Sequence, residues 1–103
     1  EAYLARRLKY ERGNQVFSVA IWIDPATAHF IRERRWHITQ DIEENADGSL
    51  ILRMDVPGLN DLKRWVLGYG KGAMVLEPSQ LVEMVQTEII SMNERYKLSN
   101  LLG

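Results

Sequence analysis

Few side chains in this sequence are of the types that perform covalent or metal chemistry. There is no cysteine, which excludes a disulfide framework, a zinc–thiolate site and a thiol nucleophile. His37 and Asp41 can share one face of a strand, but two ligands do not make a zinc site. No serine lies in the Gly-x-Ser-x-Gly context of a hydrolase nucleophile. We therefore expect a protein that is not an enzyme and that holds no metal or cofactor.

A glycine-rich run, Gly68-Tyr69-Gly70-Lys71-Gly72, has the composition of a phosphate-binding loop. Phosphate loops lead from a strand into the N-terminus of a helix, whose free N–H groups meet the anion. Here the run follows a predicted helix and precedes a predicted strand, so it meets the negative end of the helix dipole. We interpret Gly70 as the left-handed residue that ends the helix.

Length and charge narrow the class of protein further. With 103 residues the chain suits one domain, and it has no run of about 18 apolar residues that would span a membrane. Its 13 basic and 14 acidic side chains give a net charge of -1, whereas a free-standing nucleic-acid binder usually carries a strong basic excess. The distribution is uneven: residues 1–37 hold seven basic and four acidic groups, and residues 38–61 hold one basic and six acidic groups.

The first half of the sequence predicts a strand, a helix and a hairpin. Residues 16–23 alternate with a period of two, which is typical of a strand with one buried face. Asp24 then suits a helix N-cap, and Pro25 suits the first helical position. Asp47-Gly48 predicts a tight turn with positive φ at both residues, between hairpin strands at 37–45 and 49–56.

The second half predicts a helix, a strand and a longer helix. Asn60 or Asp61 caps the first helix. Its apolar stripe has the spacing i, i+3, i+4 and i+7, at Leu62, Trp65, Val66 and Tyr69. A short strand follows at 73–77, and Pro78 starts a helix that we expect to end at about residue 97.

In order, these elements predict an α+β domain with a βαββαβ core, the ferredoxin-like arrangement. We expect a four-stranded antiparallel sheet in the order 4-1-3-2, with both crossover helices on one face because such crossovers are right-handed. The domain covers residues 16–97. We expect residues 1–15 to be a linker or helical segment from a missing upstream domain and residues 98–103 to be a flexible tail.

Two functions known for this topology do not fit the residues. RNA-recognition modules stack bases on aromatic side chains of the central strands, and the strand at 49–56 has no aromatic residue. Acylphosphatase-like chemistry needs an arginine-bearing phosphate loop after the first strand, where this chain has Ile23-Asp24-Pro25-Ala26.

The helix-free face of the sheet is a candidate contact surface. By the strand alternation it carries Trp22, Ile51, Arg53 and Asp55. A tryptophan exposed among apolar and charged groups is typical of a protein contact. The alternative is that the N-terminal segment covers this face, and the residues leave both interpretations open.

Four stretches stand in a recognisable order: Trp36-His37-Ile38-Thr39-Gln40, Asp47-Gly48-Ser49-Leu50, Leu62-Lys63-Arg64-Trp65-Val66-Leu67-Gly68-Tyr69-Gly70 and Val75-Leu76-Glu77-Pro78-Ser79-Gln80-Leu81. Together they resemble the C-terminal extension domain, called WCX, of bacterial WYL-domain transcriptional regulators of the helix-turn-helix, DeoR-like class. The resemblance runs from about Val16 to Tyr96.

The resemblance implies a regulator of three parts, of which this chain is the last. A winged helix-turn-helix would bind DNA, a WYL domain would sense a ligand, and the ferredoxin-like extension would dimerise and respond to the effector. The implied partners are a second copy and the upstream WYL and helix-turn-helix domains, with DNA bound only through the missing helix-turn-helix. The implied location is cytoplasmic, without membrane contact. Trp65-Val66-Leu67 is not the Trp-Tyr-Leu motif of the sensor, so no sensor residues are carried over.

The highlighted residues divide into structural positions and a candidate contact patch. Backbone geometry or packing accounts for Asp24, Pro25, Asp47, Gly48, Trp65, Gly70 and Pro78. The predicted patch, for a ligand or a neighbouring domain, comprises Arg32, Arg34, Arg35, Trp36, His37 and Gln40. Arginine forks suit phosphate groups, so a nucleotide or single-stranded nucleic acid is a candidate effector. The second hypothesis is a stand-alone small-ligand sensor of the same fold.

Overall fold

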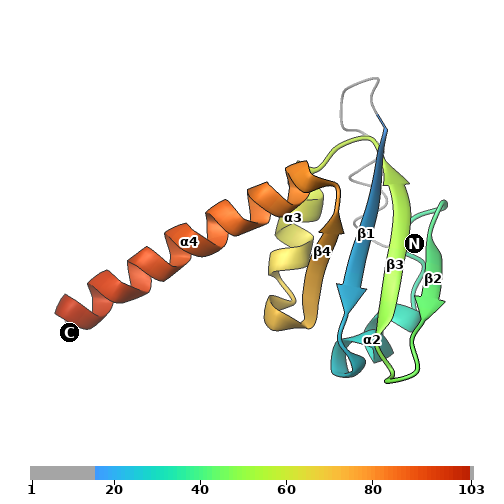
Figure 1. Cartoon of the computed structure of the whole chain (residues 1–103), viewed down its shortest axis with the longest axis horizontal. Helices are drawn as coiled ribbons and strands as arrows, with labels where there is room; N and C mark the ends of the chain where they lie inside the picture. Colours follow the sequence, from blue (N-terminus) through green and yellow to red (C-terminus); the bar gives the residue numbers. More distant parts are fainter. Residues whose placement is uncertain (1–15, 103) are drawn as a thin grey trace.

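The four strands form one antiparallel sheet (Figure 1). A computed structural model describes residues 16–102, so the expected helical segment at 1–15 lies outside the described residues. The sheet order is β2-β3-β1-β4, which is β4-β1-β3-β2 when read from the other edge. The strands are β1 (Phe17–Ile23), β2 (Asp41–Glu44), β3 (Leu50–Val56) and β4 (Ala73–Glu77). The prediction of an α+β fold with a four-stranded antiparallel sheet is confirmed.

Alternation gives the sheet one buried face, strictly along β3, whereas on β1 Ala20 is buried on the opposite face as well. On β3, Leu52 is fully buried while its neighbour Arg53 is exposed. Ile21 on β1 lies opposite Leu52 on one side and Val75 of β4 on the other, and all three side chains are buried. Side chains two residues apart point to the same face of a strand, so these residues form the floor of the core.

Helices α2 (Pro25–Arg32) and α3 (Asn60–Leu67) cover this floor. Ile31 of α2 and Leu62 of α3 are fully buried in the same cluster. The predicted cap of α2 is confirmed, since the Asp24 carboxylate accepts a 2.8 Å hydrogen bond from Thr27 N. The predicted cap of α3 is wrong: the N-cap residue is Leu59, without a side-chain hydrogen bond, and its burial in the core holds the helix entry instead.

The hairpin turn between β2 and β3 lies one step earlier than predicted. Gly48 N donates to Asn45 O at 3.1 Å, and Gly48 has a φ of 93°. The prediction of a positive φ at Asp47 is wrong. The turn runs from Asn45 to Gly48, so Asp47 is its third residue, and only Gly48 has a left-handed conformation. The Asp47 carboxylate instead accepts hydrogen bonds from Ser49 N at 2.9 Å and from Ser49 Oγ at 2.6 Å.

The first hairpin strand is also shorter than predicted, because it begins at Asp41 rather than at residue 37. Side chains replace the backbone ladder in the missing part. The Gln40 side-chain oxygen accepts hydrogen bonds from the backbone N–H groups of Trp36 and His37. The Thr39 hydroxyl accepts from Asp55 N at 2.9 Å and donates to Asp55 O at 3.3 Å.

Glycines shape the connection from α3 to β4. Gly70 has the predicted left-handed conformation, with a φ of 59°, but it opens the short 3-10 turn η1 (Gly70–Gly72) rather than ending α3. The C-cap of α3 is Gly68, whose φ of -63° is right-handed. Gly72 packs so closely on α2 that a Cβ atom there would overlap the Thr27 hydroxyl.

Helix α4 (Ser79–Leu102) begins after a cis Glu77–Pro78 bond and diverges from the sheet beyond β4 (Figure 1). Leu81 is fully buried, and Val82 and Val85 pack against the edge of the core. The helix was expected to end at about residue 97. It continues through residues 98–102, so the expected tail is helical there.

Candidate functional site

Trp36, predicted at the contact patch, lies in the core. Its side chain is only 6% exposed, and its indole Nε1 donates a 3.1 Å hydrogen bond to Ile31 O. Its ring meets the Trp65 ring edge to face, with centroids 5.1 Å apart. Trp36 therefore packs the segment that follows α2 against helix α3.

Trp65, predicted in the core, is half-buried at the margin of the cluster. It lies between Trp36 and Tyr69, whose ring centroid is 5.0 Å away. Burial raises the pKa of the Tyr69 hydroxyl, and the positive charge of Arg34 opposes that shift. Arg34 also holds its guanidinium 5.9 Å from the Trp36 ring centroid, within the range of a cation–π contact.

Arg32 makes a fork-shaped contact with the hairpin. Its guanidinium donates to the two Glu44 carboxylate oxygens at 2.7 and 2.9 Å and to Gly48 O at 2.9 Å. These hydrogen bonds raise the pKa of Arg32 and lower the pKa of Glu44. Since the guanidinium is already engaged, this arginine holds α2 to the β2–β3 turn.

The predicted patch is thus divided between structural contacts and surface groups. Gln40 closes the loop before β2, as described above. His37 Nδ1 lies 2.9 Å from Thr39 Oγ1, which draws its ring into the same loop. Arg34 and Arg35 are exposed. A ligand-binding role for the patch stays a prediction, and these two arginines are the groups that could perform it.

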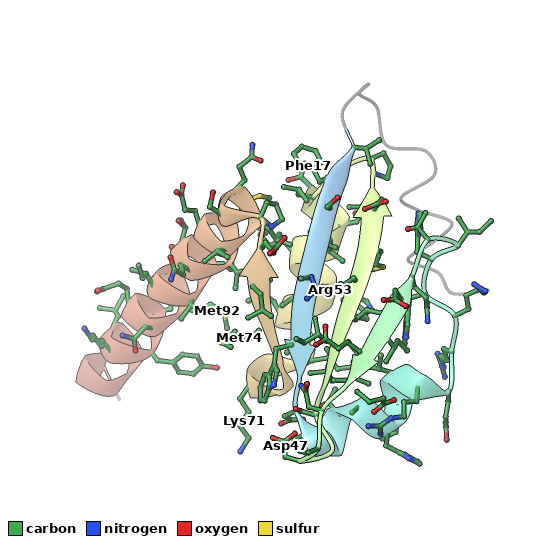
Figure 2. All side chains as sticks on the ribbon, turned by 45° about the vertical axis from the view of Figure 1, so that its right-hand side comes forward. Phe17, Asp47, Arg53, Lys71, Met74 and Met92 are labelled. Carbon is green, nitrogen blue, oxygen red and sulfur yellow. The ribbon has the colours of Figure 1, made fainter. Side chains whose placement is uncertain are left out.

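The open face of the sheet assembles as the strand alternation predicted. Trp22 lies opposite Ile51 of β3 and Met74 of β4, and Figure 2 shows Arg53 and Met74 on these strands. Ser18 Oγ donates to Asp55 Oδ1 at 2.9 Å. Arg53 Nη2 lies 3.3 Å from Glu43 Oε1. Trp22 and Ile51 are half-buried, whereas the charged groups are exposed.

Exposed apolar side chains concentrate on β4 and the outer part of α4. We define the β4–α4 surface by its members, each at least 43% exposed: Met74, Leu76, Ile89, Met92 and Tyr96. Met74 and Leu76 lie outside the contact surfaces predicted from the sequence. The signal was present in the alternation of residues 73–77, which turns the even-numbered side chains away from the core.

A shallow groove of about 520 Å³ separates α3 from α4. Lys63 Nζ and Glu88 Oε1 lie 3.6 Å apart at its edge. The lining mixes apolar and polar side chains: Leu59, Lys63, Gln80, Glu83, Met84, Thr87 and Glu88.

Over residues 16–102 there is no cluster of three or more potential metal-ligating side chains, and no helix there has the length and apolar character needed to cross a membrane. His29 Nε2 lies 3.5 Å from Glu33 Oε2, one helical turn away. The expectation that His29 has no carboxylate three or four residues further along its helix is therefore wrong, since Glu33 stands at i+4.

Comparison with protein families identifies the domain. A family model described as the WCX domain matches residues 15–92, most of the chain. The chain belongs to the WCX domain family. No curated protein was found to match it. The matched part of this WCX domain includes the sheet, α2, α3 and the inner part of α4, whereas Tyr96 and the end of α4 lie beyond it.

Proposed function

We propose that this WCX domain is the regulatory and dimerisation module of a bacterial WYL-type transcriptional regulator, and that it acts in the cytoplasm without catalysis. The observation that carries the proposal is the family match over residues 15–92. The ferredoxin-like classification is part of the proposal, and it is supported by the βαββαβ element order and the sheet order β2-β3-β1-β4.

DNA binding is assigned to a separate helix-turn-helix domain of the same protein. The chain has a net charge of -1, so it offers little release of counterions from duplex DNA, the main source of sequence-independent affinity. Within the predicted patch, Arg34 and Arg35 are exposed and lie outside the Arg32–Glu44 ion pair, and both are on the short connection after α2. We expect no salt-sensitive shift of a duplex by this chain alone.

The gene upstream of Glu1 tests the proposal directly. The expected result is an open reading frame that encodes a helix-turn-helix and a Trp-Tyr-Leu sensor domain joined to this chain. A start codon immediately before Glu1 would contradict it. In the full regulator, deletion of the WCX domain should lower operator affinity or abolish its dependence on effector, measured by a mobility shift.

An effector with phosphate groups is part of the same proposal. It would contact Arg34 and Arg35, and the Trp36–Trp65 pair beside Arg34 provides an intrinsic reporter. A nucleotide or a single-stranded oligonucleotide should quench tryptophan fluorescence, and Arg34→Ala should weaken this response while the control Lys97→Ala on α4, an exposed basic residue outside the patch, leaves it unchanged. No quenching by either ligand in the full regulator would remove this effector class.

A stand-alone sensor of small ligands is the second candidate, supported by the groove between α3 and α4. A ligand there would meet Lys63 and Glu88 above an apolar floor formed by Leu59 and Met84. A thermal-shift screen of small zwitterions should then raise the Tm, and Met84→Ala should abolish the shift. A Tm that no compound in the screen changes would favour the first candidate.

A further inference from the structure

Helix α4 carries the sequence pattern of a coiled-coil seam. Val82, Val85, Ile89, Met92 and Tyr96 follow one another at spacings of three and four residues, the a and d positions of a heptad repeat. The first two pack against the core of the domain. The last three are 51%, 45% and 69% exposed. The seam therefore begins inside the domain, and its outer three residues are each about half exposed or more.

We propose that two copies of this chain pair through the outer halves of their α4 helices, in antiparallel orientation. The inference rests on the dimerisation included in the proposed function, and it names the surface and the orientation. Ile89 of each copy would pack beside the partner's Met92. The interface would contain two such Ile89–Met92 pairs related by a two-fold axis. Each copy then contributes the same surface, as a closed homodimer requires.

The charges beside the seam favour the antiparallel orientation. Glu88 and Arg95 each precede an a-position residue, which places them at the flanking g positions. With Ile89 opposite the partner's Met92, Glu88 faces the partner's Arg95, and the reverse pair follows by symmetry. In a parallel pair, by contrast, Glu88 would face the uncharged Asn93. Glu88 is already held beside the seam by Lys63, 3.6 Å away in its own chain.

Strand β4 supplies a second wall for the incoming helix. Met74 and Leu76 are 52% and 43% exposed on β4, and in Figure 2 Met74 and Met92 lie in the angle between β4 and the diverging α4. A partner helix seated in this angle would therefore contact both α4 and β4.

The available area suits a weak dimer. An aromatic side chain offers about 150–250 Å² and an aliphatic one less, so the five partly exposed residues of the β4–α4 surface supply at most roughly 500 Å² per copy. Two copies bury at most about 1,000 Å², which is at the lower limit for a specific interface. We expect dissociation in the micromolar range for this chain and a tighter dimer in the full regulator, where other domains add contacts.

Sedimentation equilibrium of the chain over about 5–500 μM tests the pairing across the expected range. The parent should form dimers, and Ile89→Asp should make it monomeric. Glu88→Arg and Arg95→Glu should each raise the Kd about tenfold, since each places two like-charged pairs at the seam. The double variant Glu88→Arg/Arg95→Glu should have a Kd below that of either single variant, although the loss of the Lys63–Glu88 pair within each chain keeps it above the parent Kd. Glu94→Arg, one position from Arg95 and outside the seam, is the matched control and should leave the Kd unchanged.

The outcomes separate the orientation, the surface and the proposed function. A parent that stays monomeric at every concentration, or a dimer that Ile89→Asp leaves intact, overturns this interface. A dimer that is broken by Ile89→Asp but indifferent to the single charge reversals overturns the antiparallel orientation. Far-ultraviolet circular dichroism of each variant confirms that it is folded. The upstream gene sequence decides the regulatory function independently of all these results.

Discussion

The ring planes of Trp36 and Trp65 meet at 62° with their centroids 5.1 Å apart, and this contact joins the segment after α2 to helix α3. The edge-to-face arrangement suits the positive rim and negative face of two indoles. Because Trp36 also satisfies its own N–H group by a hydrogen bond to Ile31 O, it can be buried without an unpaired polar atom. The more deeply buried of the pair is therefore Trp36.

Replacement of Trp36 by alanine should cost about 3–5 kcal/mol of unfolding free energy, the range for a buried aromatic side chain. Trp65→Ala should cost less, since half-buried Trp65 already contacts solvent. Urea denaturation of both variants measures the two losses. A larger loss for Trp65→Ala would contradict the burial of these residues.

Stability should fall in acid because two aspartates are stabilised in their charged forms. The backbone N–H and the hydroxyl of Thr27 lower the pKa of Asp24, and the hydroxyl and N–H of Ser49 lower the pKa of Asp47. A lowered pKa in the folded state contributes stability above the unfolded pKa, about 3.9 for Asp, and this contribution is lost as the pH falls through the folded value.

The variant Asp24→Asn/Asp47→Asn should show a shallower loss of Tm than the parent when the pH is lowered from about 5 to 2.5. Glu44, whose pKa Arg32 lowers, should keep part of the slope. Thermal unfolding followed by circular dichroism across this range provides the measurement. If parent and double variant lose Tm in parallel, the hydrogen bonds to these carboxylates do not cause the acid sensitivity.

Alanine substitutions at two glycines of the η1 turn should lower the stability of the protein for different reasons. A Cβ at Gly72 meets the Thr27 hydroxyl, so Gly72→Ala should cost about 1–3 kcal/mol through overpacking. A Cβ at Gly70 meets no atom within 4 Å, but its φ of 59° should cost Gly70→Ala about 1–2 kcal/mol. Adding Thr27→Ala should recover stability for the Gly72 variant and not for the Gly70 variant. A double-mutant cycle by urea unfolding checks this, and equal coupling at both positions would refute it.

The hydroxyl of Thr39 should contribute about 1 kcal/mol, because it makes two hydrogen bonds to the backbone of Asp55 at the edge of the sheet. Thr39→Val keeps the shape and removes these bonds, whereas Thr39→Ser keeps the hydroxyl. We expect a lower free energy of unfolding for the valine variant alone. Hydrogen exchange at the Asp55 amide should also become faster in that variant, and unchanged exchange would contradict the assigned contact.

Local patterns were sufficient to predict most elements of the fold. The alternation of apolar residues located β1 and β3, and Asp24-Pro25 located the start of α2, because strand faces and helix caps depend on neighbouring residues. The start of β2 was misplaced because the side chains of Thr39 and Gln40 satisfy backbone groups that a strand would have satisfied. Hydrogen bonds of this kind have no periodicity in the sequence.

The candidate surfaces were predicted unevenly for a related reason. The parity of β1 and β3 was enough to bring Trp22, Ile51 and Arg53 to one face. The burial of Trp36 was not predicted, since it depends on contact with Trp65, a residue distant in sequence that belongs to another element. For a tryptophan in an irregular connection, no periodic pattern of neighbouring residues predicts whether its side chain is buried or exposed.

Helix α4 is anchored near its first turns, where Leu81 is fully buried, and the rest of the continuous helix extends past the sheet edge. Its 24 residues span about 36 Å at 1.5 Å per residue, so a tilt of about 10° at the base moves the far end by about 6 Å. A small rotation of the anchored end therefore produces a large displacement of the free end. A repacking of a few side chains around Leu81, too small to alter the sheet, is amplified into a displacement comparable to one helical turn at the other end.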